Sequence, residues 1–224
     1  MLLTSRSHAE YRAMFDLSDA DLAGVTLDCA AGASSFAAVA SAAGARVLAT
    51  DPLYAQGADA LAARLPDDLV RAQEMHRAAA DRFVWDWYGS PARYQEIRVE
   101  SGTRFLADLR RAPGRYLAAG LPYLPLADRS VDLVLCSHLL FTWAGEHDHA
   151  WHRAAVLEMC RVARREVRIF PLVHLGPGEP VEFLGRLRAE VEQVTGARTA
   201  CPPVPYEFQR GADRMLRIRL HRGQ

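Results

Sequence analysis

The chain has 224 residues, a length that fits one α/β domain of ordinary size with room for an insertion. Lys plus Arg and Asp plus Glu each number 27, so the formal net charge is zero and there is no excess of cations to follow a nucleic-acid backbone. His8 and Glu10 interrupt any apolar leader, and no uncharged stretch reaches membrane-spanning length. We therefore expect a cytoplasmic protein without nucleic-acid or membrane partners.

The four cysteines show neither CxxC spacing nor a small disulfide-rich context, so we expect reduced thiols and no structural zinc. Cys29 and Cys136 end strands that we expect to be neighbours. We interpret both as small buried side chains, with a thiol pair as the alternative.

The first predicted element is a short amphipathic helix. Ser7 and Glu10 form a capping-box pattern, and apolar residues then recur at helical spacing through Phe15. We expect residues 1–23 to form a helical cap on the domain.

An apolar strand that ends in an acid and continues through small residues into a helix comes next. It is the segment VTLDCAAGASS, from Val25 to Ser35. Only small side chains let backbone N–H groups approach a ligand closely, and the start of the following helix adds unpaired donors. An acid beside this turn repels a pyrophosphate but suits an ammonium, so Asp28 favours an amino-acid-bearing nucleoside over a dinucleotide.

The following helix is predicted over 35–43 and the second strand over 46–50, where Asp51–Pro52 ends it. Residues 55–114 are almost wholly helical in pattern, and we interpret them as an insertion. Further strands are predicted over 115–119, 131–137 and 166–171, helices over 146–163 and 179–195, and a terminal hairpin over 204–208 and 214–220. This alternation predicts a mostly parallel sheet with one antiparallel strand.

The order of segments resembles the class I S-adenosylmethionine-dependent methyltransferases, a Rossmann-like α/β family whose mostly parallel seven-stranded sheet ends in a C-terminal antiparallel hairpin. Four segments carry the resemblance: LDCAAGASS, LATDPLY, LPLADRSVDLVLCSHLLF and LEMCRVARREVRIFP. The resemblance implies a single methyltransferase domain over 1–224. It also implies a helical insertion between strands 2 and 3 as a lid on the acceptor site, S-adenosylmethionine as cofactor and S-adenosylhomocysteine as product.

The resemblance also assigns residues to the cofactor. Asp28 is expected near the methionine ammonium, directly or through water, and Gly32 gives the closest backbone approach. Asp51 is expected to accept from the ribose hydroxyls, and Leu53 to lie against the adenine. The predicted cofactor-binding residues are Asp28, Ala30, Gly32, Ser34, Ser35, Asp51, Pro52, Leu53, Gly120, Leu121 and Ser137.

Two places depart from the family pattern. Ala30 and Ser34 replace the outer glycines of the loop; we expect Ala30 to reach its turn with negative φ and Ser34 to cap the next helix. The acid that often meets the adenine amino group is replaced at Gly120 or Leu121, which leaves adenine recognition to backbone groups.

Methyl transfer from a sulfonium is an in-line displacement, so the protein chiefly places the acceptor and excludes water. His138 follows the fourth strand, where this fold opens its crevice, and is the candidate base for a hydroxyl or ammonium acceptor. The alternatives are a ligand-contacting or simply hydrogen-bonded histidine. The predicted acceptor-site residues are Tyr11, Trp85, Tyr88, His138 and Phe141.

Aromatic residues gather in the second part of the insertion, at Phe83, Trp85, Trp87, Tyr88 and Tyr94. They suit the wall of an acceptor pocket, and the alternative is that they pack the insertion against the core. Trp85 lies off the helical stripe of Phe83 and Trp87, which makes it the better pocket candidate.

Three histidines, His147, His149 and His152, lie near a predicted helix start. Their spacing permits a metal site, but we interpret them as a solvated helix face and predict no metal.

We conclude that the sequence predicts a methyltransferase, and the neutral charge favours a small-molecule acceptor. One alternative is an RNA or protein methyltransferase, although CSHLLF lacks the Asn/Asp-Pro-Pro-aromatic motif of amino-group nucleic-acid enzymes. The other is a non-catalytic protein that binds S-adenosylmethionine or S-adenosylhomocysteine.

Overall fold

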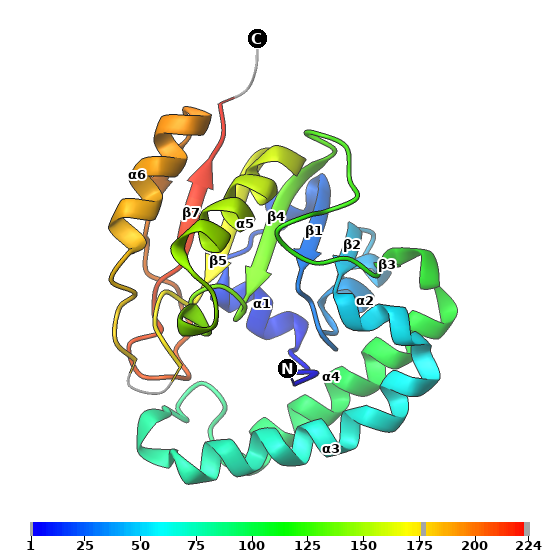
Figure 1. The fold of residues 1–224 in the computed structure, drawn as a ribbon. Helices are drawn as coiled ribbons and strands as arrows, with labels where there is room; N and C mark the ends of the chain where they lie inside the picture. The colour runs from blue at the N-terminus through cyan, green and yellow to red at the C-terminus, as the bar shows by residue number, and fades with distance from the viewer. Residues whose placement is uncertain (1, 176–177, 222–224) are drawn as a thin grey trace.

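The computed structural model describes residues 2–175 and 178–221. At its centre lies a seven-stranded sheet in the order β3-β2-β1-β4-β5-β7-β6 (Figure 1). The first five strands pair in parallel, and β7 runs antiparallel to both β5 and β6. This order and these directions confirm the predicted fold class. The strands are β1 Val25–Cys29, β2 Arg46–Thr50, β3 Tyr116–Leu117, β4 Val131–Ser137, β5 Ala163–Phe170, β6 Arg198–Ala200 and β7 Leu216–Arg219.

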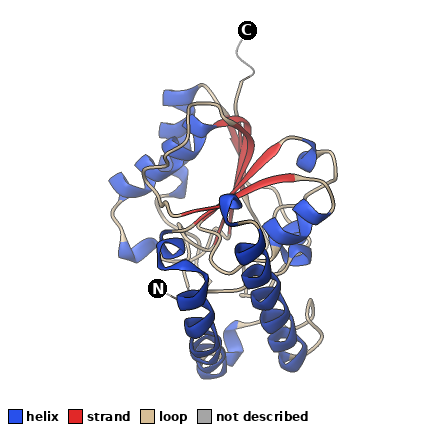
Figure 2. Cartoon of the chain, turned by 90° about the vertical axis from the view of Figure 1, so that its right-hand side faces the viewer, coloured by secondary structure: helices blue, strands red, loops and turns tan. Residues whose placement is uncertain are grey.

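Helices cover both faces of the sheet (Figure 2). They are α1 His8–Met14, α2 Phe36–Ala42, α3 Gly57–Ala78, α4 Pro91–Arg111, α5 His149–Val162 and α6 Leu184–Thr195. Within the described ranges, no helix combines the length and the apolar character that crossing a membrane requires.

The inserted helices α3 and α4 follow β2 and precede β3, as predicted. In Figure 1 they run side by side beneath the carboxyl ends of β1 and β4. At α4 the sequence supplies a helix start, because the Ser90 side chain accepts from the Arg93 N–H at 3.1 Å and Pro91 occupies the first turn.

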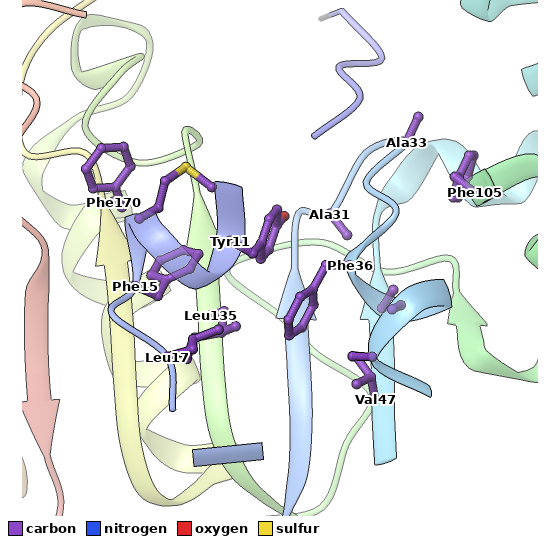
Figure 3. Packing of buried hydrophobic residues seen from close by; sticks show 14 of the residues in the cluster. Tyr11, Phe15, Leu17, Ala31, Ala33, Phe36, Val47, Phe105, Leu135 and Phe170 are labelled. Atoms are coloured by element: carbon purple, nitrogen blue, oxygen red, sulfur yellow. The ribbon is translucent and has the colours of Figure 1, made fainter. Parts of the chain in front are cut away.

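Helix α1 has the predicted capping box. The Ser7 hydroxyl accepts from the Glu10 N–H at 3.2 Å, and the Glu10 carboxylate accepts from the Ser7 N–H at 2.7 Å. Tyr11 and Phe15 are fully buried, and the Tyr11 ring stacks on Phe36 of α2 at 4.8 Å (Figure 3). The helix thereby closes one face of the sheet beside α2.

The C-terminal hairpin differs from the prediction in its first strand. Strand β6 follows α6 directly, and residues 204–208 form no strand. Instead Phe208 is buried, and its carbonyl accepts from the Val84 N–H of the insertion at 2.6 Å. The apolar run at 204–208 therefore packs against the insertion, a tertiary contact that overrides its strand propensity.

His152 corrects the prediction of a solvated histidine face. It is fully buried on α5, with its two ring nitrogens 2.8 Å from the Asp148 carbonyl oxygen and 3.1 Å from that of Leu140. Cys29 and Cys136 are register partners on β1 and β4, and both are buried free thiols, as interpreted from the sequence.

Candidate functional site

A cavity of about 140 Å³ lies at the carboxyl ends of three neighbouring strands. Ala30 and Gly32 follow β1, Asp51 follows β2, Ser137 ends β4 and His138 follows it; all five line the cavity. Strands β1 and β4 are adjacent, but the chain leaves β1 towards β2 on the other side. Open α/β sheets bind their ligands where the connections part in this way.

The insertion and the first residues of the chain form the rest of the cavity wall. Leu69 and His76 of α3, with Tyr94 and Arg98 of α4, face the same space as the strand-end residues. Residues 2–6 complete the lining, and Figure 1 shows the N-terminus between the sheet and the two inserted helices.

Residues 2–7, which we call the N-terminal strap, pair with the loop after β1. The Thr4 carbonyl accepts from the Ala33 N–H at 3.0 Å, and the Arg6 carbonyl accepts from the Ser35 N–H at 2.9 Å. Gly32 has φ of +57°, and a Cβ built there would lie 2.8 Å from the Thr4 oxygen. The N–H groups predicted to face a ligand are thus paired within the chain, and only glycine fits beneath the strap.

Asp51 is held by this same loop. One of its carboxylate oxygens accepts from the Gly32 N–H at 3.0 Å and the other from the Leu53 N–H at 2.9 Å. Each oxygen keeps a second lone pair for a hydroxyl donor. Burial raises the pKa of Asp51, and the two N–H donors act against that rise.

Asp28 lies behind the cavity wall, fully buried at the end of β1. Its Oδ1 accepts from the Tyr11 hydroxyl at 2.9 Å, and its Oδ2 has no hydrogen-bond partner in the described part of the chain. Burial raises the pKa of Asp28 well above its ordinary value, and the neighbouring Asp51 raises it further. A buried carboxylate oxygen without a donor is costly for folding and marks a place where a cationic group would be stabilised.

The turn at Ala30 differs from the prediction. Its φ is +57°, not negative, because the chain turns back sharply enough for the Ala31 N–H to donate to the Thr50 carbonyl at 3.0 Å. Ser34 caps the next helix as predicted, since its hydroxyl accepts from the Phe36 N–H at 3.0 Å.

His138 also has positive φ, +56°, an unusual conformation for a side chain with a Cβ. Its Nδ1 lies 2.8 Å from the Ser137 hydroxyl, which donates to the Met14 sulfur at 3.9 Å. The hydrogen bond with Ser137 engages Nδ1, so Nε2 is the ring nitrogen left for a ligand in the described part of the chain. Burial lowers the pKa of His138 well below its ordinary value, and the positive charges of Arg6 and Arg98 lower it further.

No family model matches the chain. An uncharacterized protein of Methanocaldococcus jannaschii is 25% identical over 219 residues, which cover 97% of this chain and 96% of that protein. The magnesium protoporphyrin IX methyltransferase of Synechocystis PCC 6803 with bound SAM matches 96% of this chain and 78% of its own, at 13% identity and a TM-score of 0.51. The SAH-bound form matches 95% and 81%, at 16% identity and a TM-score of 0.53. The chain has the class I S-adenosylmethionine-dependent methyltransferase fold.

Within this methyltransferase fold, several predicted cofactor residues lie away from the cavity. A Cβ at Gly120 would lie 2.7 Å from the Pro52 side chain, so these two segments are in close contact. The predicted cofactor-binding residues that do not line the cavity are Asp28, Ser34, Ser35, Pro52, Leu53, Gly120 and Leu121.

The predicted acceptor residues divide in the same way. Tyr11, Tyr88 and Phe141 are buried in the core and do not line the cavity. Trp85 is half-buried, with its ring 5.2 Å from Phe208, and does not line the cavity either. Of the aromatic residues in the insertion, Phe83 and Tyr94 reach the cavity.

The sequence reasoning missed Arg98, which joins the insertion to α1. Its guanidinium forms two hydrogen bonds with the Glu10 carboxylate and lies 4.4 Å from the centre of the Tyr94 ring. One pattern predicts its burial: Tyr94, Arg98, Ser101 and Phe105 recur at four- and three-residue steps, and all four are buried. A charged residue on such a stripe implies a buried partner of opposite charge.

Proposed function

We propose that this chain is an S-adenosylmethionine-dependent methyltransferase that acts on a small-molecule acceptor. The observation that carries the proposal is the cavity, where Gly32, Asp51 and His138 meet from three strand ends. Inserted helices cover this cavity. It lies at the position where open α/β sheets bind ligands.

The residues present fit S-adenosylmethionine. The unpaired Oδ2 of Asp28 suits the methionine ammonium, which would meet this oxygen beside the loop or through a water. Asp51 keeps lone pairs for the ribose hydroxyls. The cofactor supplies a methyl group activated by its sulfonium. The surrounding residues position and enclose the acceptor.

His138 is the residue that suits proton removal from the acceptor. Its ring lines the cavity, and Ser137 holds its Nδ1 at 2.8 Å. The lowered pKa keeps the imidazole unprotonated at neutral pH, the form that a base requires. The apolar walls from α3 and α4 exclude water from the reacting groups.

The enclosed shape of the cavity supports a small acceptor over a macromolecule. It is walled by the strap, the insertion and the strand ends, and the zero net charge provides no field for a polyanion. A lid of helices over a crevice is the arrangement in which a metabolite is enclosed during the reaction.

Thermal unfolding in the presence of nucleosides tests the proposal. S-adenosylmethionine or S-adenosylhomocysteine at about a hundred times its dissociation constant stabilises the folded state by roughly 2.7 kcal/mol, and NAD leaves the midpoint unchanged. Equal shifts with NAD, or none with either S-adenosyl compound, contradict the proposal. Transfer of a labelled methyl group to a small acceptor then separates an enzyme from a non-catalytic binder.

A further inference from the structure

Arg6 is a cation in the cavity wall without a matching hydrogen-bond acceptor. Its side chain is 13% exposed, and its closest carboxylate oxygen, on Glu10, is 4.0 Å away. Among residues 2–175 and 178–221, no side chain or carbonyl forms a hydrogen bond with its guanidinium. The five N–H donors of this group are therefore available to the cavity that it lines.

Glu10 forms an ion pair with Arg6 at 4.0 Å but accepts no hydrogen bond from it, because its carboxylate is already saturated. It accepts from the Ser7 N–H and hydroxyl at 2.7 and 2.8 Å, and from the Tyr88 hydroxyl at 2.5 Å. Two further hydrogen bonds come from Arg98. Five donors exceed the roughly four lone-pair sites of a carboxylate. Glu10 therefore has no lone pair left to accept a hydrogen bond from a second guanidinium.

The backbone of Arg6 is fixed, so its side chain starts from a defined point beside the cavity. Its carbonyl accepts from the Ser35 N–H at 2.9 Å at the start of α2, and the Ser5 hydroxyl beside it donates to the Arg98 carbonyl at 2.7 Å.

The wall of the same cavity includes three stacked aromatic rings. The Phe83 and Tyr94 rings stack on Phe208 at 4.7 and 4.9 Å, with interplanar angles of 27° and 17°. His76 meets all three rings edge-on. Its Nδ1 and the hydroxyl of Thr142 are buried without a hydrogen-bond partner in the described chain, and both residues line the cavity.

The charge of Arg6 acts on the acceptor side of the cavity. Its field lowers the pKa of His138, the proposed base, and of His76 on α3. Its charge also opposes the raised pKa of Tyr11, the hydrogen-bond partner of Asp28, so its field reaches both sides of the cavity.

We propose that Arg6 binds the carboxylate of the methyl acceptor, and that the acceptor is a small aromatic acid whose ring lies against the wall of Phe83, Tyr94 and Phe208. The inference rests on the proposed function. It adds the class of acceptor: one anionic group, which a guanidinium binds in bidentate fashion, and one planar apolar body.

Calorimetry with the full chain saturated with S-adenosylhomocysteine tests this inference, with 2-naphthoate and its neutral amide 2-naphthamide as probes. Wild type binds the acid on the order of tenfold more tightly than the amide, and Arg6→Gln removes that preference. Arg6→Lys keeps part of it. Arg12→Gln, a neighbouring guanidinium whose partner Asp19 is exposed, keeps all of it.

Two further measurements identify the source of the carboxylate. The first is the affinity for S-adenosylhomocysteine, and the second is the affinity for 5′-methylthioadenosine, which lacks the amino-acid carboxylate. We expect each affinity to be the same in Arg6→Gln as in wild type. A loss confined to S-adenosylhomocysteine overturns the inference in favour of the donor's own carboxylate. Failure of wild type to prefer naphthoate also overturns it, while leaving S-adenosylhomocysteine binding, and so the proposed function, intact.

Discussion

His138 combines a strained backbone, a hydrogen-bonded Nδ1 and a low pKa at the point where β4 ends. Side chains with positive φ cost free energy and are kept where the surrounding structure holds them, often at active sites. The hydrogen bond with Ser137 orients the ring through Nδ1, so Nε2 is the nitrogen that a reacting group would meet.

We predict that His138→Gln lowers the methyl-transfer rate by roughly 10²-fold to 10⁴-fold, since an amide does not act as a base. The thermal shift with S-adenosylhomocysteine is expected to persist, because the donor side of the cavity is unchanged. Single-turnover rates measured with labelled donor check this. A rate equal to that of wild type means that His138 only contacts the ligand.

The buried carboxyl of Asp28 lowers the stability of the ligand-free protein. Its pKa is raised mainly by burial, so the ionised form is disfavoured in the folded protein. A carboxyl whose pKa is higher in the folded state than in the unfolded state lowers the free energy of unfolding as the pH rises through its ordinary pKa. The deprotonated form is present in the folded protein only at that cost.

We therefore predict that Asp28→Asn raises the unfolding midpoint of the ligand-free protein at pH 7. The asparagine carbonyl still accepts from the Tyr11 hydroxyl. The same variant is expected to lose most of the midpoint shift given by S-adenosylhomocysteine, because the ammonium loses its charged partner. Scanning calorimetry with and without the ligand measures both effects; a destabilised variant that binds normally contradicts the assignment.

At the scale of elements, the pair of Glu10 on α1 and Arg98 on α4 ties the N-terminal cap to the insertion. Both side chains are at least 96% buried, since their exposed fractions are 0% and 4%. Removing one member of a buried pair leaves an uncompensated charge, whereas removing both leaves a neutral, poorer core.

We predict that Arg98→Met or Glu10→Gln alone lowers the free energy of unfolding by about 3–5 kcal/mol, and that the double variant recovers part of this loss. Chemical denaturation of the four proteins in one buffer measures the cycle. Arg93→Met is the matched control on α4, because Arg93 pairs with exposed Glu96 and is expected to change stability by less than about 1 kcal/mol. Additive single losses would show that the two residues are uncoupled.

The elements differ in how far the sequence alone predicts them. The bounds of β1, β2 and β4 match the predicted ranges, because each is a short run between clear breakers. Helix α5 begins three residues later than predicted, at His149, since Asp148 caps it by accepting from the Trp151 N–H. The hairpin strand at 204–208 was wrong, because its apolar residues contact the insertion, and no local pattern encodes that contact.

The candidate site divides along the same line. Its floor follows strand ends, so the sequence places Gly32, Asp51 and His138 there. Its roof depends on contacts between distant segments, such as the hydrogen bond from Ser5 to Arg98 across 93 positions. Arg6 reaches the cavity through such contacts. No periodic pattern in the sequence predicts which residues surround it.

For the whole molecule, buried histidines make stability depend on pH. Burial lowers the pKa of His76 from its ordinary 6.5 to about 4, with Arg98 and Arg6 lowering it further, and the pKa of His138 shifts in the same direction. Above pH 6.5 both states hold these rings neutral. As the pH falls from 6.5 towards 4, the unfolded chain takes up protons that the folded one resists, so stability is lost.

We predict that wild type loses up to about 3 kcal/mol relative to His76→Phe between pH 7 and pH 4. Phenylalanine keeps the ring contacts with Phe83 and Phe208 but does not titrate. The difference between the two proteins is the quantity to measure, because Asp28 and Asp51, with raised pKa values, act in the opposite direction in both. Parallel denaturation curves at every pH would contradict the prediction.

The pairing of the strap with the start of α2 affects which phosphate compounds bind there. A bare helix start attracts phosphates, and ATP and inorganic phosphate would compete for it. Here Thr4 and Arg6 turn their carbonyl oxygens onto those donors, so that a polyphosphate approaching this point meets electron-rich atoms. The start of α2 therefore offers a polyphosphate fewer free backbone donors than a bare helix start does.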